Sequence, residues 1–119
     1  MKEVLIYIRP NKYFSTKDAL NQAGFGAFSS ENVLGRGSHE VVCEVNYTTN
    51  TEHPLPIHSN LVAKKQISLV VRDTDVKKII DIVVNENKTG NHGDGKIFVL
   101  PVTETIRIRT GEKNDNALV

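Results

Sequence analysis

Residues 89–112 read TGNHGDGKIFVLPVTETIRIRTGE, and this stretch decides how the rest of the chain is interpreted. A glycine-rich loop opens it, an apolar segment follows, and two arginines in alternation end it. Glycine reaches backbone conformations with positive φ, so successive N–H groups of such a loop can turn inward and bind an anion. The loop therefore predicts phosphate binding through the run Gly93, Asp94, Gly95 and Lys96.

The two arginines extend this predicted site. Side chains alternate along a strand, so a strand over residues 106–109 would project Arg107 and Arg109 from the same face. Guanidinium groups bind phosphate oxygens with two parallel hydrogen bonds, and Lys96 adds a positive charge beside the glycines. We therefore expect the loop and the arginine pair to form one polyphosphate site. Taken alone, Gly93 and Gly95 are equally compatible with a tight turn that binds nothing.

Hydrophobic periodicity outside this stretch predicts the element order βαββαβ. The strongest helical pattern follows Asp73, where apolar residues recur at i, i+3, i+4, i+7 and i+8 from Val76 to Val84. Ser15 or Thr16 is expected to cap the first helix, Asp73 to cap the second, and Gly24 to follow the first helix as its C′ residue. The predicted strands are 3–9, 28–34, 67–72, 97–99 and 106–109, and the first helix is 16–23.

This order predicts an α+β fold, a ferredoxin-like βαββαβ sandwich in which strands one and three are central. A chain of 119 residues fits one domain, residues 1–119, with a modest core. Two helices cover only one face of the predicted sheet. We expect the other face to be covered by copies of the same chain or by a close paralogue, in a closed assembly.

Composition narrows the possible partners and location. The chain has 15 basic and 14 acidic residues, so its net charge of +1 favours neither nucleic acid nor an anionic membrane. A single cysteine, Cys43, excludes an intramolecular disulfide and fits a reducing compartment. No apolar run approaches the ~20 residues that span a bilayer, and no signal peptide is apparent. We expect a soluble, cytoplasmic protein without membrane insertion.

The connection between Gly35 and Lys64 is far longer than an ordinary loop, which predicts a functional segment. We expect residues 39–60 to be mobile in the free protein and to order on docking. The three histidines of this connection are irregularly spaced and lack cysteine or carboxylate neighbours, so no metal site is expected.

No nucleophile with a supporting base is recognisable in the sequence, and the glycine-rich loop lacks the G-x-x-x-x-G-K-[ST] spacing. No catalytic residues are predicted.

Three motifs carry a resemblance to a known family. They are GDGKIFV with the following Pro-Val and IRIRTGE, within residues 93–112; VLIYIRPNKYFSTKDALNQAGF, residues 4–25; and the turn Leu34-Gly35-Arg36-Gly37. In this order and over essentially the whole chain, they resemble the PII family of nitrogen-regulatory signal proteins. The resemblance implies a compact trimer with a T-loop, here about residues 37–62, and a nucleotide-binding loop at about residues 88–96.

The resemblance also implies ligands. PII proteins bind ATP or ADP between subunits, with Mg²⁺, and respond to 2-oxoglutarate. The positions that match the family's nucleotide contacts are Gly35, Arg36, Gly37, Lys64, Gly93, Asp94, Gly95, Lys96, Arg107 and Arg109. For 2-oxoglutarate the matching positions are Gly37 and Lys64. Gly37 departs from the family, which usually has a glutamine there that helps to hold magnesium and the oxoacid.

The divergent T-loop indicates a subfamily. The chain looks most similar to the archaeal nitrogen-fixation PII paralogues, and within them to the second paralogue, which implies direct T-loop docking on a nitrogenase component. Tyr47 lacks the R-G-A-E-Y context of the modified tyrosine, so its uridylylation stays open. Two alternatives also stay open: a PII regulator of an ammonium channel or another nitrogen-assimilation protein, and a small nucleotide-using enzyme. Homotrimer and mixed assembly are equally compatible with the sequence.

Overall fold

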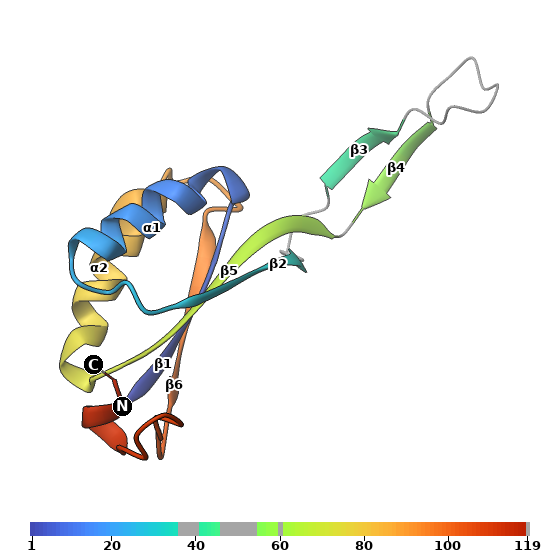
Figure 1. Ribbon diagram of the computed structural model, residues 1–119. Coiled ribbons are helices and arrows are strands. Elements are labelled where there is room, and N and C mark those ends of the chain that lie inside the picture. The colour runs from blue at the N-terminus through green and yellow to red at the C-terminus, as the bar shows by residue number, and fades with distance from the viewer. Residues whose placement is uncertain (36–40, 46–54, 60, 119) are drawn as a thin grey trace.

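A computed structural model describes residues 1–35, 41–45, 55–59 and 61–118. Four antiparallel strands form one sheet in the order β2-β5-β1-β6, and two helices pack on one of its faces (Figure 1). The elements are β1 Lys2–Ile8, α1 Tyr13–Gln22, β2 Ser29–Gly35, β5 Val62–Val71, α2 Val76–Asn87 and β6 Gly95–Pro101. The predicted ferredoxin-like α+β fold is therefore confirmed, with the first and third strands of the prediction, β1 and β5, at its centre.

The core lies between this sheet and the two helices. Alternate residues of β1 point to the helices, so Val4, Ile6 and Ile8 are buried while their neighbours are not. Strand β5 supplies buried residues in the same alternation, and α2 supplies residues one helical turn apart. The remaining core residues are Leu20, Ile67, Leu69, Val71, Ile79 and Val83. The apolar periodicity thus correctly predicted the packing of Val76, Ile79 and Val83, whereas Val84, the last residue of the predicted face, is 43% exposed.

The predicted start of the first helix was wrong. A 3-10 turn, Pro10–Lys12, leads directly into α1 at Tyr13, because proline fixes φ at a helical value and needs no N–H partner in a first turn. Ser15 and Thr16 lie inside the first turn, and their hydroxyls donate to the carbonyl of Lys12 at 3.1 and 2.8 Å. The predicted C′ residue is confirmed, since Gly24 follows the C-cap with φ of +91°, a conformation that glycine adopts without strain.

The expected cap of the second helix was also wrong. A 3-10 turn, Asp73–Asp75, precedes α2, whose N-cap is Asp75 without a side-chain capping bond. The Asp73 carboxylate instead lies 3.0 Å from the backbone nitrogen of Met1. The apolar pattern fixed the buried face of this helix, but a tertiary contact decided the use of the aspartate at its start.

The C-terminal segment turns back on itself where a strand over 106–109 was predicted. An isolated bridge pairs Ile106 with Lys113, and the Gly111 N–H donates to the Arg107 carbonyl at 2.7 Å. Gly111 has a positive φ, which favours glycine and allows the chain to reverse there. Alternation in the sequence suggested a strand, but the reversal leaves too few residues to pair with the sheet.

The long connection after β2 contains a second, two-stranded sheet. Strands β3 Val41–Val45 and β4 Leu55–Ser59 pair in antiparallel register and lie beyond the end of the main sheet (Figure 1). Residues 41–45 and 55–59 of the segment expected to be mobile are therefore paired as strands, and its mobility in the free protein stays a prediction. Among the T-loop positions singled out above, Arg36, Gly37 and Tyr47 fall outside the described residues. Within the described residues, neither helix has the length and apolarity that a bilayer span requires.

Candidate functional site

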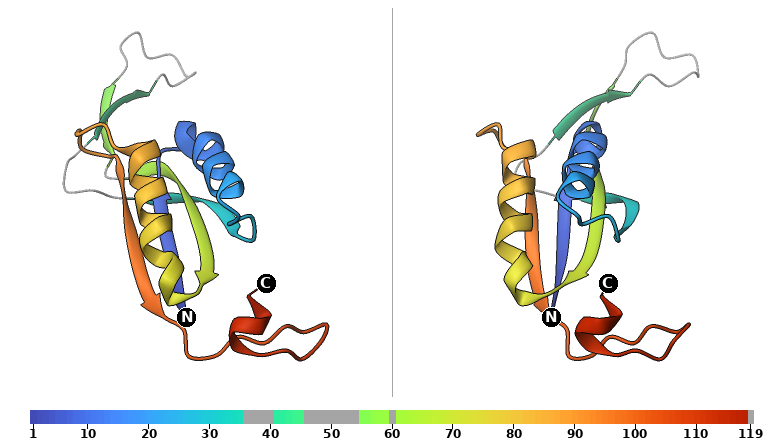
Figure 2. Two further views of the ribbon diagram at one scale, coloured as in Figure 1. Left: turned by 90° about the vertical axis from the view of Figure 1, so that its left-hand side faces the viewer. Right: turned by 60° about the vertical axis from the view of Figure 1, so that its left-hand side comes forward.

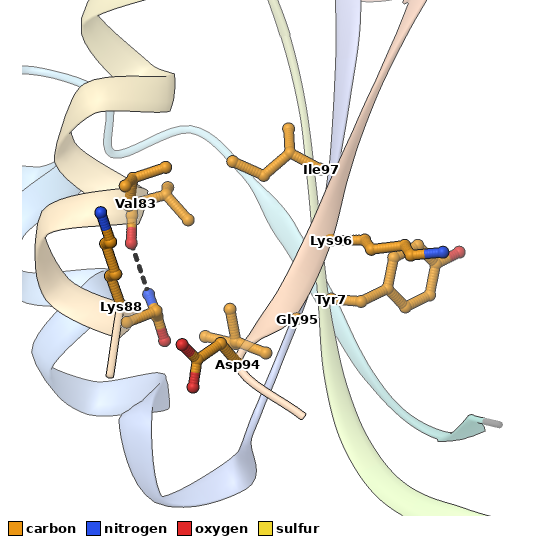
Figure 3. Close-up of a pocket in the computed structure, with 10 residues that line it drawn as sticks. Tyr7, Val83, Lys88, Asp94, Gly95, Lys96 and Ile97 are labelled. Atoms are coloured by element: carbon orange, nitrogen blue, oxygen red, sulfur yellow. Dashed lines mark hydrogen bonds between the residues drawn. The ribbon is translucent and has the colours of Figure 1, made fainter. Parts of the chain in front are cut away.

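The face of the sheet that carries no helix has a concentration of positive charge at one end. Tyr7 of β1 lies opposite Lys96 of β6, and both side chains point away from α2 (Figure 3). Tyr7 also lies opposite Gln66 of β5, so alternation places Lys64, two residues earlier, on this same face. Two lysines from different strands therefore flank Tyr7 at the end of the sheet where the glycine-rich loop lies.

Two cationic groups converge on Gly93 in this loop. Lys64 Nζ donates to the Gly93 carbonyl at 2.7 Å, and Arg9 Nη2 donates to the His92 carbonyl at 2.9 Å. A Cβ atom added at Gly93 would lie 3.2 Å from Arg9 Nη2 and 3.7 Å from Lys64 Nζ. The glycine thus keeps the space beside both cations free of a side chain, which suits the close approach of an anion.

Asp94 shapes the loop from within. Its carboxylate accepts hydrogen bonds from the N–H and hydroxyl of Thr89, from the N–H of Gly90 at 3.0 Å, and from Arg9 Nη1 at 2.7 Å. These hydrogen bonds hold the pKa of Asp94 far below its usual range, and those from Thr89 have the largest effect. Asp94 therefore holds the loop together from within, and its carboxylate oxygens already accept hydrogen bonds from protein donors.

The surroundings of Lys64 shift its pKa. Partial burial lowers the pKa of Lys64 from its ordinary value, the Arg9 guanidinium lowers it further, and Asp94 opposes both effects. A negative group placed beside Lys64 and Arg9 would favour the charged form of the lysine. The pair is therefore electrostatically suited to a phosphate or a carboxylate.

Gly95 is the position where glycine is required most strictly. It has φ of +124°, and a Cβ atom there would lie 2.0 Å from the carbonyl oxygen of Tyr7. Strand β6 can enter the sheet beside β1 at this point only because the residue has no side chain. The loop geometry and the register of the edge strand therefore depend on the same residue.

A groove of about 350 Å³ lies on the opposite, helix-covered side of the same loop. It runs between the end of α2 and the start of β6, and Val83, Lys88, Asp94 and Ile97 face it in Figure 3. Lys96 projects to the other side of β6, as strand alternation requires. Lys96 also lines this groove, but its ammonium group points away from it, toward the helix-free face.

The two arginines lie at the other end of β6. The loop precedes Gly95 and the C-terminal segment follows Pro101. The strand between these residues is roughly 20 Å long at the usual rise per residue. Both views in Figure 2 show the C-terminal segment at the end of the sheet opposite to the loop. Within one chain the loop and the arginines therefore lie apart, so their union in one site stays a prediction for an assembly of subunits. The predicted strand that would place both arginines on one face was wrong, because residues 108–110 form a turn.

Arg107 and Arg109 also differ from one another. Arg107 is partly buried, pairs with Glu112 Oε2 at 2.7 Å, and donates to the Asn116 carbonyl at 3.2 Å. Arg109 is exposed in the turn that reverses the chain. Arg107 is thus held in a fixed position, whereas Arg109 lies at the tip of the segment.

Of the remaining predicted positions, only Gly35 is described. It ends β2, and a Cβ atom there would lie 3.3 Å from Lys64 Cγ, so this glycine also adjoins the cationic end of the sheet. The described residues contain no group of three histidine, cysteine or acidic side chains that would bind a metal ion.

Arg9 is the residue that sequence reasoning missed. It was interpreted only as the end of the first strand before Pro10, yet it contacts Asp94 and His92, more than eighty residues away. The available signal was its position two residues after Tyr7, which alternation assigns to the helix-free face. Its partner in the loop could not be identified without the tertiary fold.

These features define a small α+β protein with a cationic end on the helix-free face of its sheet. The model of the family described as Nitrogen regulatory protein P-II matches residues 1–112. "Nitrogen fixation nifHD region GlnB-like protein 2" of Methanobacterium ivanovii is 37% identical over 122 residues, covering 100% of both chains. "Nitrogen fixation nifHD1 region GlnB-like protein 2" of Methanosarcina barkeri is 40% identical over 122 residues, covering 99% of both.

A solved structure extends the likeness to three dimensions. The crystal structure of Arabidopsis thaliana PII bound to citrate matches with a TM-score of 0.74 and 29% identity, over 98% of this chain and 88% of that one. The chain belongs to the PII family of nitrogen regulatory proteins. Its full-length relatives carry names tied to nitrogen-fixation regions.

Proposed function

We propose that this PII protein is a non-enzymatic cytoplasmic signal protein that binds ATP or ADP, with Mg²⁺, and 2-oxoglutarate, and regulates nitrogen fixation by docking its T-loop on a nitrogenase component. The observation that carries the proposal is the convergence of Arg9 and Lys64 on Gly93, with Lys96 on the same face of the sheet. Three cations beside a glycine-rich loop suit a polyphosphate.

The open face of the sheet supports an oligomer, for which the family suggests a trimer. Phe98 and Leu100 of β6 are 49% and 40% exposed there, and the Phe98 ring packs edge-on against Tyr7 at a centroid distance of 5.8 Å. An exposed apolar patch beside an edge strand is normally covered by a partner. In our proposal another subunit, of this chain or of a paralogue, covers it.

The same assembly would complete the nucleotide site. One chain keeps its loop and its arginines at opposite ends of β6, so a single nucleotide reaches both only where two subunits meet. We infer that Lys96 and Gly93 of one subunit face Arg107 and Arg109 of the next. Gly35, Arg36 and Gly37, at the base of the T-loop, would approach the nucleotide from the loop's own subunit.

The 2-oxoglutarate proposal rests on Lys64 and its newly identified neighbour Arg9. Two cations beside Gly93 suit a dicarboxylate, and the solved relative from Arabidopsis thaliana is described as bound to citrate, which is also a polycarboxylate. Because Gly37 offers no side-chain ligand and Asp94 is engaged within its loop, Mg²⁺ would depend on nucleotide phosphates. We therefore expect 2-oxoglutarate to bind only together with MgATP.

Regulation follows from a two-state T-loop. Each effector shifts the loop between its states only by binding one state more tightly than the other. The nitrogen-fixation names of the relatives and the length of the connection between β2 and β5 support nitrogenase as the target. In this proposal, 2-oxoglutarate relieves the inhibition that the docked loop causes.

Subunit mixing tests the intersubunit site directly. Lys96→Ala and Arg107→Ala proteins are each expected to bind ATP weakly, because each removes one partner from every cleft. After unfolding and refolding together, every mixed trimer regains one cleft that takes its lysine from one variant and its arginine from the other. Calorimetry should then detect tight ATP sites in the mixture. Their absence in mixtures shown by mass spectrometry to contain mixed trimers would refute the arrangement.

Loop replacement tests the target. Replacing residues 39–60 with a short glycine-serine connection should leave assembly and ATP affinity unchanged, since the glycine-rich loop and the arginines lie elsewhere in the chain. The same variant should no longer inhibit nitrogenase in an assay with purified components. Inhibition by the shortened protein, or binding of the intact protein to an ammonium channel but not to nitrogenase, would overturn the proposal.

A further inference from the structure

A buried polar contact joins the two helices behind the glycine-rich loop. Thr16 is 0% exposed and Asn87 is 5% exposed, and they are the two buried polar residues of the described chain. Asn87 Nδ2 donates to Thr16 Oγ1 at 3.0 Å and to the Val83 carbonyl at 2.8 Å. The Thr16 hydroxyl in turn donates to the Lys12 carbonyl at 2.8 Å.

The orientation of the Asn87 amide is fixed by these partners. The Val83 carbonyl only accepts, and the Thr16 hydroxyl has already donated its proton, so both must receive the amide N–H groups. Asn87 Oδ1 is then the remaining atom, and it is buried without a hydrogen-bond partner among the described residues. An apolar pair of similar volume would join the helices without a buried unpaired oxygen, so stability alone does not account for this pair.

Two runs of consecutive contacts lead to the proposed ligand site, one from Thr16 and the other from Asn87. In the first run, the Lys12 N–H donates to the Arg9 carbonyl at 3.0 Å, and Lys12 accepts from Thr16. In the second, Asn87 ends α2 two residues before Thr89, whose N–H donates to Asp94 Oδ2 at 2.7 Å.

Two side-chain hydrogen bonds join these runs of contacts into a closed ring. One is the bond between Asn87 and Thr16 at the helices. The other is the bond from Arg9 Nη1 to Asp94 Oδ1, at 2.7 Å, beside the glycines. The position of Arg9 relative to Asp94 therefore depends on how the start of α1 is placed against the end of α2. Among the described residues, the hydrogen bond between Asn87 and Thr16 is the only buried side-chain polar contact between α1 and α2, so it sets how these helices lie against each other.

We propose that Thr16 and Asn87 are positioning residues that hold the glycine-rich loop in its anion-binding conformation without touching the ligand. The inference rests on the proposed nucleotide and oxoacid site, because it assigns the pair a role at that site. When the pair is lost, the end of α2 shifts against α1, Arg9 separates from Asp94, and the Thr89 and Gly90 N–H groups lose their shared acceptor.

Hydrogen exchange in the ligand-free protein tests the role independently of any ligand. In Asn87→Ala and in the double variant Thr16→Val/Asn87→Ala, the amides of Thr89 and Gly90 should exchange about tenfold faster than in the unchanged protein. The double variant replaces the pair with apolar groups and leaves no unpaired amide, so it remains informative if the single variant folds poorly. Ile79→Val is the matched control, because it weakens the same helix in the core without touching the ring.

ATP affinity supplies the second measurement. The double variant should bind ATP about threefold to tenfold more weakly at an unchanged thermal midpoint, whereas Ile79→Val should lower the midpoint and leave the affinity unchanged. Unchanged exchange at Thr89 and Gly90 in the double variant would overturn the inference. If the unchanged protein bound neither ATP nor 2-oxoglutarate, the proposed function would fail, while the exchange rates would still decide whether the pair orders the loop.

Discussion

The two ends of strand β6 are held in place by different kinds of contact. At the Gly95 end, the loop is bound to Arg9, which follows β1, and to Lys64 of β5. At the Pro101 end, the C-terminal segment is bound largely to itself, as in the pairing of Arg107 with Glu112. The loop end is held by contacts with the sheet and its neighbouring residues, whereas the C-terminal end is held mainly by contacts within its own turn.

This difference indicates which part of the proposed site is complete in one chain. At the loop end, the cations, the glycines and the internal carboxylate of the proposed site are already in place within one chain. The C-terminal end holds Arg107 in position, but the full length of β6 separates it from the loop. In our proposal, the two ends are halves of one site that a second copy of the chain would join.

Replacing a positive-φ glycine at each end of β6 should give the largest difference in stability between the two ends. Gly95→Ala should destabilise the fold by about 3–5 kcal/mol, because the new Cβ would overlap the Tyr7 carbonyl oxygen in a strained backbone conformation. Gly111→Ala is the matched control, since its φ is also positive but its Cβ would enter open space. For that variant the backbone strain alone should cost about 1–2 kcal/mol. Urea unfolding of both variants measures the difference, and equal losses would contradict it.

Removing one cation from each end tests whether both bind the same nucleotide. Lys96→Ala and Arg107→Ala should each weaken ATP binding by about 1.5–3 kcal/mol, or about tenfold to a hundredfold. Calorimetry would measure both affinities. Lys77→Ala is a suitable control, since Lys77 lies on the exposed surface of α2 and pairs with Asp81. Unchanged ATP affinity in either variant would remove that residue from the site.

Acid should weaken the loop end of β6, where the carboxylate of Asp94 lies. The folded pKa of Asp94 lies below its unfolded value, so its contribution to stability is complete above the unfolded pKa of about 4 and is lost as pH falls below it. Asp94→Asn should therefore be less stable than the unchanged protein at pH 7, with a smaller difference at pH 3. Unfolding curves at both values check this, and a difference that grew in acid would show the opposite linkage.

Alkaline pH should produce the smallest effect. Burial and Arg9 lower the pKa of Lys64, so its charge is lost at a lower pH than that of an ordinary lysine. As pH rises toward the ordinary lysine pKa of about 10.4, affinity for 2-oxoglutarate in the presence of MgATP should therefore fall. Lys64→Arg keeps its charge over this range and should show a flatter profile. Identical profiles would indicate that Lys64 does not meet the oxoacid.

The sequence predicted more of the loop end than of the C-terminal end for a physical reason. Glycines at 93 and 95 indicate unusual backbone conformations, and both have positive φ in the structure. Arg107 and Arg109 alternate as they would in a strand, but alternation does not distinguish a paired strand from a turn. The deciding contact, from the Gly111 N–H to the Arg107 carbonyl, depends on the reversal at Gly111.

Local patterns of the sequence by themselves determined the βαββαβ order, most of the buried face of α2, the glycine that follows α1 and the positive-φ glycines of the loop. Each of these follows from side-chain periodicity or from the backbone freedom of one residue type. Only the tertiary structure decided that Arg9 joins Lys64 at Gly93, that Asn87 meets Thr16, and that the arginines lie at the far end of β6. Those outcomes depend on which distant segments the sheet brings together, and short-range patterns carry no information about such pairings.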